Sequence, residues 1–310
     1  MIARIPRLLH QFWTGPDMPS VVKDQVCRWT EMNPDWTHTV WDADRTLALL
    51  RRTFTPALAA IFQAALHPAM KSDIGRYAIL YARGGVYVDT DTIPRSPLSD
   101  FIPRHSKVIL IRVQRDSSSP YAIKNDFLAC QQHNPLMLAI VREIVRRCSN
   151  PKHNNIHYLT GPNMLRDVAR SHLTDPLGDA TVLYRPDLMR LLSGLKIDYD
   201  EIGGHWSKTQ VTDGVLSEIR YDTAYYHGLA AHVRGRLVPA AAWGGLRICP
   251  ATGHAFIHYG GMHARLELGE AIPGAQPATE EIRHALTKLG ITFDDPDDGI
   301  QQAIHAAATG

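Results

Sequence analysis

The sequence predicts an α/β fold, because strand-like and helix-like patterns alternate along the chain. Short apolar runs, bounded by glycine, proline or acidic residues, read as strands. Between them lie stretches with apolar residues at helical spacing. The clearest such helix is Ala69–Arg83, which stops at Gly84-Gly85. Its buried stripe is expected to consist of Ile74, Tyr77, Ala78 and Tyr81.

The individual elements follow from local signals. Gly15-Pro16 ends the first strand, and the turn-like Asn33-Pro34-Asp35 separates the first helix from the second strand. Asp42 or Asp44 is placed to cap the helix from Thr46. We expect strands at Leu8–Trp13, Trp36–Trp41, Val86–Val88, Lys107–Arg112 and His254–Tyr259. We expect helices at Val21–Met32, Thr46–Arg52, Pro56–Leu66, Ala69–Arg83, from Asn134-Pro135 to about Arg147, and from Gly161-Pro162 onward.

The length of 310 residues fits one large domain with an extension. We expect residues 1–268 to form this domain and residues 269–310 to form a linker plus a short helical C-terminal extension. Residues 269–279 are rich in Ala, Gly and Pro, and Glu280–Leu289 reads as the short helix. Residues 193–245 lack firm periodicity, so we expect loops that shape a binding site there.

Composition excludes several classes of protein. The net charge of +2 gives no reason to expect nucleic acid as a partner. The 4 cysteines form no CxxC pair, which predicts buried free thiols in a reducing compartment. No run approaches the roughly 20 apolar residues of a spanning helix, and the N-terminal apolar stretch is too short for a secretion signal. We therefore expect a cytoplasmic protein without a transmembrane segment, for which peripheral contact with a membrane stays open.

Asp89 and Asp91 are the leading candidates for chemistry. Segment 84–91 reads Gly-Gly-Val-Tyr-Val-Asp-Thr-Asp, so an apolar strand ends in two carboxylates at positions i and i+2. Such side chains point to the same side of an extended chain, at the edge of the sheet where ligands bind. Paired carboxylates suit Mn²⁺ or Mg²⁺, which in turn holds a diphosphate. The alternative is that these residues only cap the next element, as we expect for Asp42 and Asp44.

Asp73 and Arg76 lie three residues apart on the Ala69–Arg83 helix. Spacing alone favours a surface ion pair worth less than about 1 kcal/mol. The functional alternative is that Asp73 accepts hydrogen bonds from ligand hydroxyls, while Arg76 donates paired hydrogen bonds to phosphate or sugar oxygens.

Two blocks of the sequence carry a family resemblance. The first comprises segment 5–15, Ile-Pro-Arg-Leu-Leu-His-Gln-Phe-Trp-Thr-Gly, then Trp29 and segment 33–42. The second is Lys71-Ser72-Asp73-Ile74-Gly75-Arg76-Tyr77, followed by Leu80-Tyr81 and segment 84–91. Together they resemble glycosyltransferases with a DXD sugar-binding region, a group that includes Och1-type mannosyltransferases of yeast, bacterial capsular-polysaccharide sugar transferases and the glucosylating domain of large clostridial toxins. The resemblance covers about the first hundred residues well and is patchy beyond them.

The resemblance implies a GT-A fold, a Rossmann-like mixed sheet flanked by helices that binds a nucleotide sugar. It also implies roles for single residues. Trp13, with Phe12 beside it, matches the aromatic that stacks on the nucleobase; without the family, a core position is the better reading for Trp13. Asp73 and Arg76 match the pair that contacts donor sugar and ribose or phosphate. Asp89 matches the carboxylate near the sugar and ribose, and Asp91 the direct metal ligand.

Weaker matches lie downstream. Asn125 resembles the asparagine that approaches the donor sugar, although Asp126 stands where a small residue is expected. Thr160-Gly161 belongs to a Thr-Gly-Pro element that lines the site in the family. His258 resembles the family's final histidine and is a candidate metal ligand, although Met262-His263 replaces the usual Ser-Trp. A packed or surface histidine is an equal alternative for His258.

We therefore expect a metal-dependent, retaining glycosyltransferase that uses Mn²⁺ or Mg²⁺. The expected donor is a nucleotide sugar carrying a hexose or N-acetylhexosamine, with UDP-sugars favoured over GDP-mannose. The expected acceptor is a glycan or a lipid-linked saccharide. Two alternatives stay open: a toxin-like or effector-like enzyme that modifies a protein acceptor, and a non-catalytic module that binds a sugar nucleotide.

Overall fold

The computed structural model describes residues 5–15, 17–54, 56–103, 106–112, 123–149, 154–172, 180–184, 188–190, 192–195, 214–220, 243–248, 255–259 and 262–265. The chain divides into two compact units. The first comprises Met1–Thr46 with Ala65–Ser217, and the second Leu47–Ala64 with Glu218–Gly310. No helix of the described residues is long and apolar enough to span a membrane.

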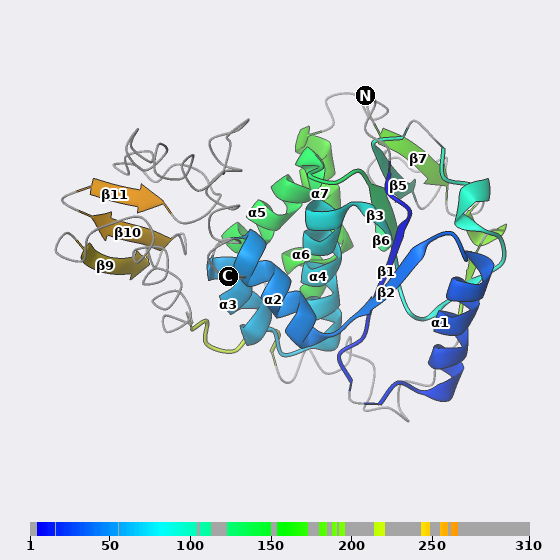
Figure 1. The fold of residues 1–310 in the computed structure, drawn as a ribbon, viewed down its shortest axis with the longest axis horizontal. Helices are drawn as coiled ribbons and strands as arrows, with labels where there is room; N and C mark the ends of the chain where they lie inside the picture. The colour runs from blue at the N-terminus through cyan, green and yellow to red at the C-terminus, as the bar shows by residue number, and fades with distance from the viewer. Residues whose placement is uncertain are drawn as a thin grey trace. The chain divides into compact units, whose positions relative to one another are not determined.

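A six-stranded mixed sheet forms the centre of the first unit, with the order β2-β1-β3-β6-β5-β7 (Figure 1). Its strands are β1 (Leu8–Phe12), β2 (Thr37–Trp41), β3 (Gly85–Val88), β5 (Val108–Arg112), β6 (Ile123–Cys130) and β7 (Ala180–Tyr184). β1 pairs in parallel with β2 and β3, whereas β6 runs antiparallel to β3 and β5. The α/β class with a mixed sheet, predicted from the alternating patterns and the family resemblance, is confirmed.

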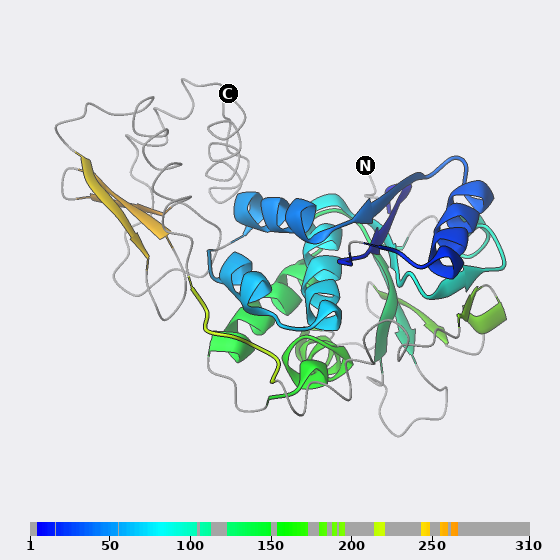
Figure 2. The ribbon, with the colours of Figure 1, turned by 90° about the horizontal axis from the view of Figure 1, so that it is seen from below.

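Helices cover both faces of this sheet. α4 (Pro68–Arg83), α5 (Pro135–Ser149), α6 (Ile156–Leu159) and α7 (Pro162–His172) lie on one side, and α1 (Ser20–Met32) on the other (Figures 1 and 2). α4 packs directly on β1, β3 and β6. On the α1 side, β4 (Thr92–Pro94) pairs with β8 (Leu192–Gly194), and the short helix η1 (Leu98–Asp100) follows β4.

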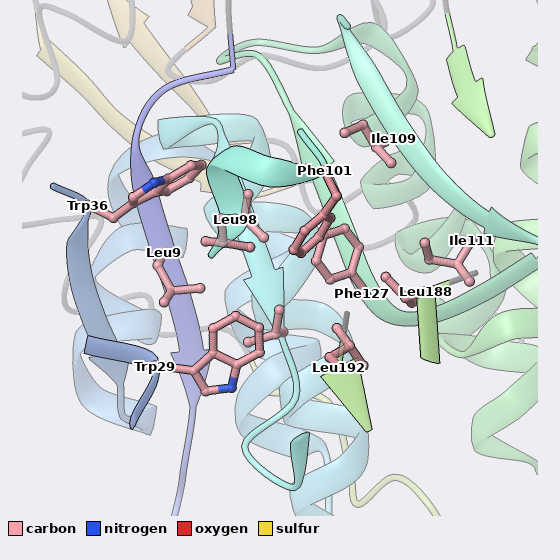
Figure 3. Packing of buried hydrophobic residues seen from close by; sticks show 13 residues of the cluster. Leu9, Trp29, Trp36, Leu98, Phe101, Ile109, Ile111, Phe127, Leu188 and Leu192 are labelled. Carbon is pink, nitrogen blue, oxygen red and sulfur yellow. The ribbon is translucent and has the colours of Figure 1, made fainter. Parts of the chain in front are cut away.

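The face of the sheet opposite α4 carries a large apolar core (Figure 3). Val86 and Val88 of β3 contribute to it, with Leu9 of β1 and Phe127 of β6. α1 covers these side chains with the fully buried Trp29. Burial of this much apolar surface is the main force that holds α1 onto the sheet.

Gly84 and Gly85 join α4 directly to β3. Both have positive φ, at 65° and 98°, a region that favours glycine. A Cβ on Gly85 would lie 2.4 Å from the Leu8 carbonyl oxygen, and one on Gly84 would lie 2.5 Å from the Gln132 nitrogen. The double glycine therefore lets the chain turn from the helix into a strand that pairs closely with β1.

A buried histidine supports the same junction. The indole nitrogen of Trp41 donates to His10 Nδ1 at 3.2 Å, so His10 Nε2 carries the hydrogen and donates to the Gly84 carbonyl at 3.0 Å. Burial lowers the pKa of His10 to about 4. The ring is therefore neutral near pH 7, as an acceptor at Nδ1 requires.

The second unit contains the end of α2 (Ala43–Thr53), α3 (Pro56–Ala64) and an antiparallel sheet of order β11-β10-β9. Its strands are β9 (Trp243–Ile248), β10 (Ala255–Tyr259) and β11 (Met262–Arg265). β10 confirms the late strand expected at His254–Tyr259. The expected linker at 269–279 and helix at 280–289 lie outside the described residues, as does most of the loop segment 193–245.

Most expected elements of the first unit are confirmed, with boundaries shifted by at most two residues, except that α2 begins at Ala43, three residues before the expected Thr46. The Asp42 carboxylate accepts from the Arg45 backbone N–H at 2.7 Å, which confirms it as the cap of α2. β4, β6, β7, β8 and α6 were not predicted. The expectation of buried thiols holds for Cys130 and Cys148 and is wrong for Cys27, which is exposed on α1.

Candidate functional site

Strand alternation at the end of β3 delivers one carboxylate to α4. Val86 and Val88 face the apolar core, so Tyr87 and Asp89 face the opposite side. The Tyr87 hydroxyl lies 2.8 Å from the Ser72 hydroxyl of α4. One Asp89 carboxylate oxygen lies 3.1 Å from Arg76 Nη2. The strand predicted to present Asp89 therefore aims it at the helix that carries Asp73 and Arg76.

Arg76 is held by hydrogen bonds on every nitrogen of its guanidinium. Nε donates to the Ser72 carbonyl at 3.3 Å, and Nη1 donates to the Asn125 carbonyl. Nη2 donates to the Ser72 hydroxyl at 2.9 Å and pairs with both Asp73 and Asp89. The group also lies over the Tyr87 ring, 4.8 Å from its centroid. Burial opposes its charge, but the surrounding negative groups, Asp89 first, raise the pKa of Arg76 further above its ordinary value.

Asp73 is equally enclosed. It accepts from the Asn125 side-chain amide at 2.8 Å, from the Thr160 hydroxyl at 3.0 Å and from Arg76 at 3.2 Å. Asp73 is 6% exposed and Arg76 is 5% exposed. Burial raises the pKa of Asp73, while Arg76 and the two neutral donors act in the opposite direction. The surface ion pair that spacing alone favoured is therefore wrong, because both residues lie beneath the protein surface.

A bulge in β6 brings Asn125 to this cluster. Ile109 of β5 pairs with Ala129 of β6. Ile111, two residues further along β5, pairs with Lys124, which lies five residues from Ala129 on β6. Such bulges re-aim side chains. Phe127 faces the apolar core, whereas the Asn125 amide reaches Asp73 and the Tyr77 hydroxyl at 3.1 Å on the α4 side. A regular strand would place both residues on the same face.

Thr160 and Gly161 approach Asp73 from the loop between α6 and α7. A Cβ on Gly161 would lie 3.4 Å from an Asp73 carboxylate oxygen and 2.8 Å from the His157 α-carbon. A buried arginine holds this loop, because Arg147 Nη1 donates to the Tyr158 carbonyl at 2.7 Å. Arg147 also pairs with Glu143 and Asp167, at 2.7 and 3.0 Å.

Phe12 and Trp13 differ in exposure. Phe12 is buried, and two of its ring carbons lie 3.5 and 3.6 Å from the position a Cβ would take on Gly75 of α4. Trp13 is partly exposed just after the end of β1, and within the described part of the chain its indole N–H has no hydrogen-bond partner. Trp13 is therefore not the fully buried core residue that residue type alone suggests. A nucleobase-stacking role stays a prediction for both residues.

The turn that follows β3 combines acidic charge with partial exposure. The Asp89 side chain is 28% exposed, and Asp91 is also partly exposed. Burial raises the pKa of Asp89 to about 8; Arg76 opposes this shift, and Asp91 and Asp126 add to it. The carboxyl groups of Asp89, Asp91 and Asp126 therefore lie close enough to repel one another when they are ionised.

A divalent cation fits these residues. It would relieve this repulsion, and Asp91 and Asp89 would hold it from the protein side. No group of three or more metal-ligating side chains gathers among the described residues. The remaining ligands of such an ion would come from a bound phosphate group and water, as is usual for Mg²⁺.

His258 lies on β10 in the second unit, for which the structure describes only the backbone pairing. Its predicted role as a metal ligand therefore stays a prediction, and His254 lies outside the described residues.

The structure adds three residues that sequence analysis did not select for the site. Ser72, Tyr77 and Tyr87 surround Arg76 and Asn125. Tyr77 was assigned only to the buried stripe of α4, and Tyr87 only to an apolar strand. The signal for their role was present in the sequence, because a buried hydroxyl needs a polar partner.

The comparisons with known proteins place a family region over this site. Residues 19–109 match the model of the glycosyltransferase sugar-binding region containing a DXD motif. The chain is similar to the initiation-specific alpha-1,6-mannosyltransferases of Candida albicans, with 34% identity over 116 residues, and of Schizosaccharomyces pombe, with 26% over 205 residues. The matches cover 36% and 58% of this chain, and 30% and 52% of those relatives.

It is also similar to inositol phosphoceramide mannosyltransferase 1 of Schizosaccharomyces pombe, with 23% identity over 144 residues, 46% of this chain and 43% of that protein. The chain thus spans about half or less of the length of these relatives.

Among solved structures, the PaToxG glycosyltransferase has a TM-score of 0.46 and 16% identity, covering 55% of this chain and 71% of that one. The UDP-bound glycosyltransferase domain of the YGT toxin has a TM-score of 0.42 and 13% identity, covering 78% and 88%. These structural likenesses are loose. The family match rests on residues 19–109, which include Asp73, Arg76, Asp89 and Asp91 and which match the model of the DXD-type glycosyltransferase sugar-binding region.

Proposed function

We propose that the protein is a metal-dependent glycosyltransferase that moves a hexosyl group from a nucleoside diphosphate sugar to a saccharide or lipid-linked acceptor. One observation carries the proposal: Arg76 joins a buried Asp73 to Asp89 at the start of the turn that bears Asp91. This arrangement lies inside the matched DXD region.

We assign separate roles to the residues of the site. Asp73 and Asn125 present a fixed set of hydrogen-bonding groups to donor hydroxyls, because Thr160 and Tyr77 hold them in place. Arg76 keeps Asp73 and Asp89 together and balances their charge. The N–H groups of Arg76 donate hydrogen bonds within the protein. We therefore assign Arg76 a positioning role instead of the bidentate binding of phosphate expected from its residue type.

Asp91, with Asp89, would hold Mn²⁺ or Mg²⁺ against the diphosphate. The cation supplies charge stabilisation for the departing nucleoside diphosphate. Trp13, partly exposed after the end of β1, would stack on the nucleobase. Retention of the anomeric configuration and a cytoplasmic location stay predictions.

The sugar is the finer part of the proposal. The similar proteins are named as mannosyltransferases, and this favours a mannosyl donor over the UDP-sugars expected from the sequence. One of these names specifies an alpha-1,6 linkage and another specifies inositol phosphoceramide, which supports a saccharide or lipid-linked acceptor over a protein.

The test is release of nucleoside diphosphate from a panel of UDP-sugars and GDP-mannose, with Mn²⁺, Mg²⁺ or chelator. The variant is Asp91→Asn. The matched control is Asp44→Asn on α2, because Asp42-Ala43-Asp44 also has two aspartates at positions i and i+2. We expect metal-dependent release from one donor, lost in the first variant and kept in the control. Tight donor binding without release, even with saccharide and lipid acceptors present, would instead identify a non-catalytic module.

A further inference from the structure

Both backbone polar groups of Asp89 are held by hydrogen bonds. Its N–H donates to the Asp126 carbonyl at 3.1 Å. Its carbonyl accepts from the Thr92 hydroxyl at 2.6 Å and from the Gln11 side-chain amide at 3.3 Å. The two donors come from different places, since Thr92 opens β4 and Gln11 lies on β1. The carbonyl of Asp89 is thus a meeting point of two chains of hydrogen bonds.

The first chain starts in the apolar core. The indole nitrogen of Trp29 lies 3.2 Å from the Thr92 hydroxyl and 3.1 Å from the Thr92 carbonyl. An indole N–H only donates and a carbonyl only accepts. The Thr92 hydroxyl therefore accepts from Trp29 and gives its own hydrogen to Asp89. Trp29 is fully buried between α1 and the sheet, so this donor is fixed in place (Figure 3).

The second chain runs through Gln11, which is 0% exposed. Because the Asp89 carbonyl accepts, the Gln11 nitrogen must face it and the Gln11 oxygen must accept elsewhere. That oxygen lies 3.0 Å from His38 Nε2, which therefore carries the ring hydrogen. His38 Nδ1 lies 2.8 Å from the Thr30 hydroxyl and accepts from it. Burial lowers the pKa of His38 to about 4, which keeps the ring neutral near pH 7.

We propose that Gln11 and Thr92 are positioning residues that hold the Asp89 carbonyl and so fix the turn bearing Asp89 and Asp91. Only three residues connect β3 to β4, so fixing one carbonyl leaves the two carboxylates little freedom. The Asp91 carbonyl adds a further tie, because it accepts from the Leu195 N–H at 2.6 Å. The expected effect of Gln11 and Thr92 on metal binding rests on the proposed function. Their role in holding the turn does not depend on it.

The chain offers matched controls for this proposal. Gln25 is a buried glutamine whose side-chain amide donates to Val21 of its own helix. Thr46 is a buried threonine whose hydroxyl has no hydrogen-bond partner among the described residues. Gln25→Leu and Thr46→Val therefore remove the same chemical groups as Gln11→Leu and Thr92→Val, but remove no hydrogen bond to the turn that the described residues show.

The first measurement is hydrogen–deuterium exchange of the full-length chain, read on peptides that cover residues 86–94. We expect exchange there to rise roughly three- to tenfold in Gln11→Leu and Thr92→Val, the effect of losing about one hydrogen bond. The two controls should leave it unchanged, and Thr92→Ser should restore the wild-type rate. Unchanged exchange in the test variants, or an equal rise in the controls, overturns the proposal.

The second measurement is Mn²⁺ affinity in the presence of UDP or GDP, by electron paramagnetic resonance. Gln11→Leu and Thr92→Val should weaken it roughly three- to tenfold, with rescue by Thr92→Ser. Full Mn²⁺ affinity in variants with a loosened turn would overturn the positioning role. Absence of Mn²⁺ binding by the wild type would instead refute the proposed function, and the exchange result would still decide whether these residues hold the turn.

Discussion

Arg76 Nη2 lies 3.1 Å from a carboxylate oxygen of Asp89, so a residue of α4 and a residue after β3 share one ion pair. The same nitrogen lies 3.2 Å from Asp73. Replacing Arg76 with Met leaves two carboxylates without a counter-charge in a buried place. We expect Arg76→Met to lower the free energy of unfolding by about 3–5 kcal/mol, measured by urea denaturation.

The control for this variant is Arg146→Met. Arg146 pairs with Glu143 on α5, but its side chain is 66% exposed. Exposed pairs contribute less than about 1 kcal/mol, so this variant should be nearly as stable as the wild type. A similar loss in both variants would show that burial of Arg76 is not the cause.

Gly85 is expected to tolerate no side chain. Its φ of 98° and the 2.4 Å approach of a Cβ to the Leu8 carbonyl oxygen act together. We expect Gly85→Ala to lower the free energy of unfolding by more than about 2 kcal/mol. Gly194→Ala is the matched control, because nothing lies within 4 Å of the added atom. Thermal unfolding compares the two, and equal stability would contradict the close pairing of β1 and β3.

His10 predicts a loss of stability in acid. Its pKa in the folded protein is about 4, below the 6.5 of a free imidazole. Between pH 6.5 and 4 the unfolded chain binds a proton that the folded protein excludes. The free energy of unfolding should therefore fall as the pH falls through this window, by up to about 3 kcal/mol from His10. Nuclear magnetic resonance of the ring nitrogens in the folded protein should show the neutral Nε2–H form down to about pH 4; titration near 6.5 would contradict the prediction.

Trp13 offers a direct test of nucleobase stacking. If the partly exposed ring carries the base, Trp13→Ala should weaken binding of the preferred nucleoside diphosphate by about 1–3 kcal/mol in calorimetry. Trp13→Phe should retain much of that affinity, because it keeps an aromatic face. Unchanged affinity in a folded Trp13→Ala variant would assign the ring to packing alone.

The sequence predicted the elements whose pattern is local. α4 was visible because its apolar residues recur at helical spacing and Gly84-Gly85 ends it. β6 was missed because Lys124, Asn125 and Asp126 interrupt an alternation that would otherwise mark a strand. Its bulge cannot be derived from spacing, since it depends on how β5 and β3 pair on either side.

Burial at the candidate site was the main property that local pattern did not reveal. Asp73 and Arg76 look like a surface pair when only α4 is considered. They become buried because Asn125 and Thr160, about 50 and 87 residues away in sequence, cover them. Such contacts are decided by tertiary packing, for which helical periodicity carries no signal.

The sheet order has a consequence for how the chain folds. β3 lies between β1, which precedes it by more than 70 residues, and β6, which follows 35 residues later. During synthesis, one edge of β3 therefore stays unpaired until residue 130 has left the ribosome, and the hydrogen bond from Thr160 to Asp73 forms later still. Non-local pairing of this kind slows folding and exposes strand edges to association with other chains. We expect this protein to depend most on chaperones at the stage when β3 has emerged from the ribosome and β6 has not.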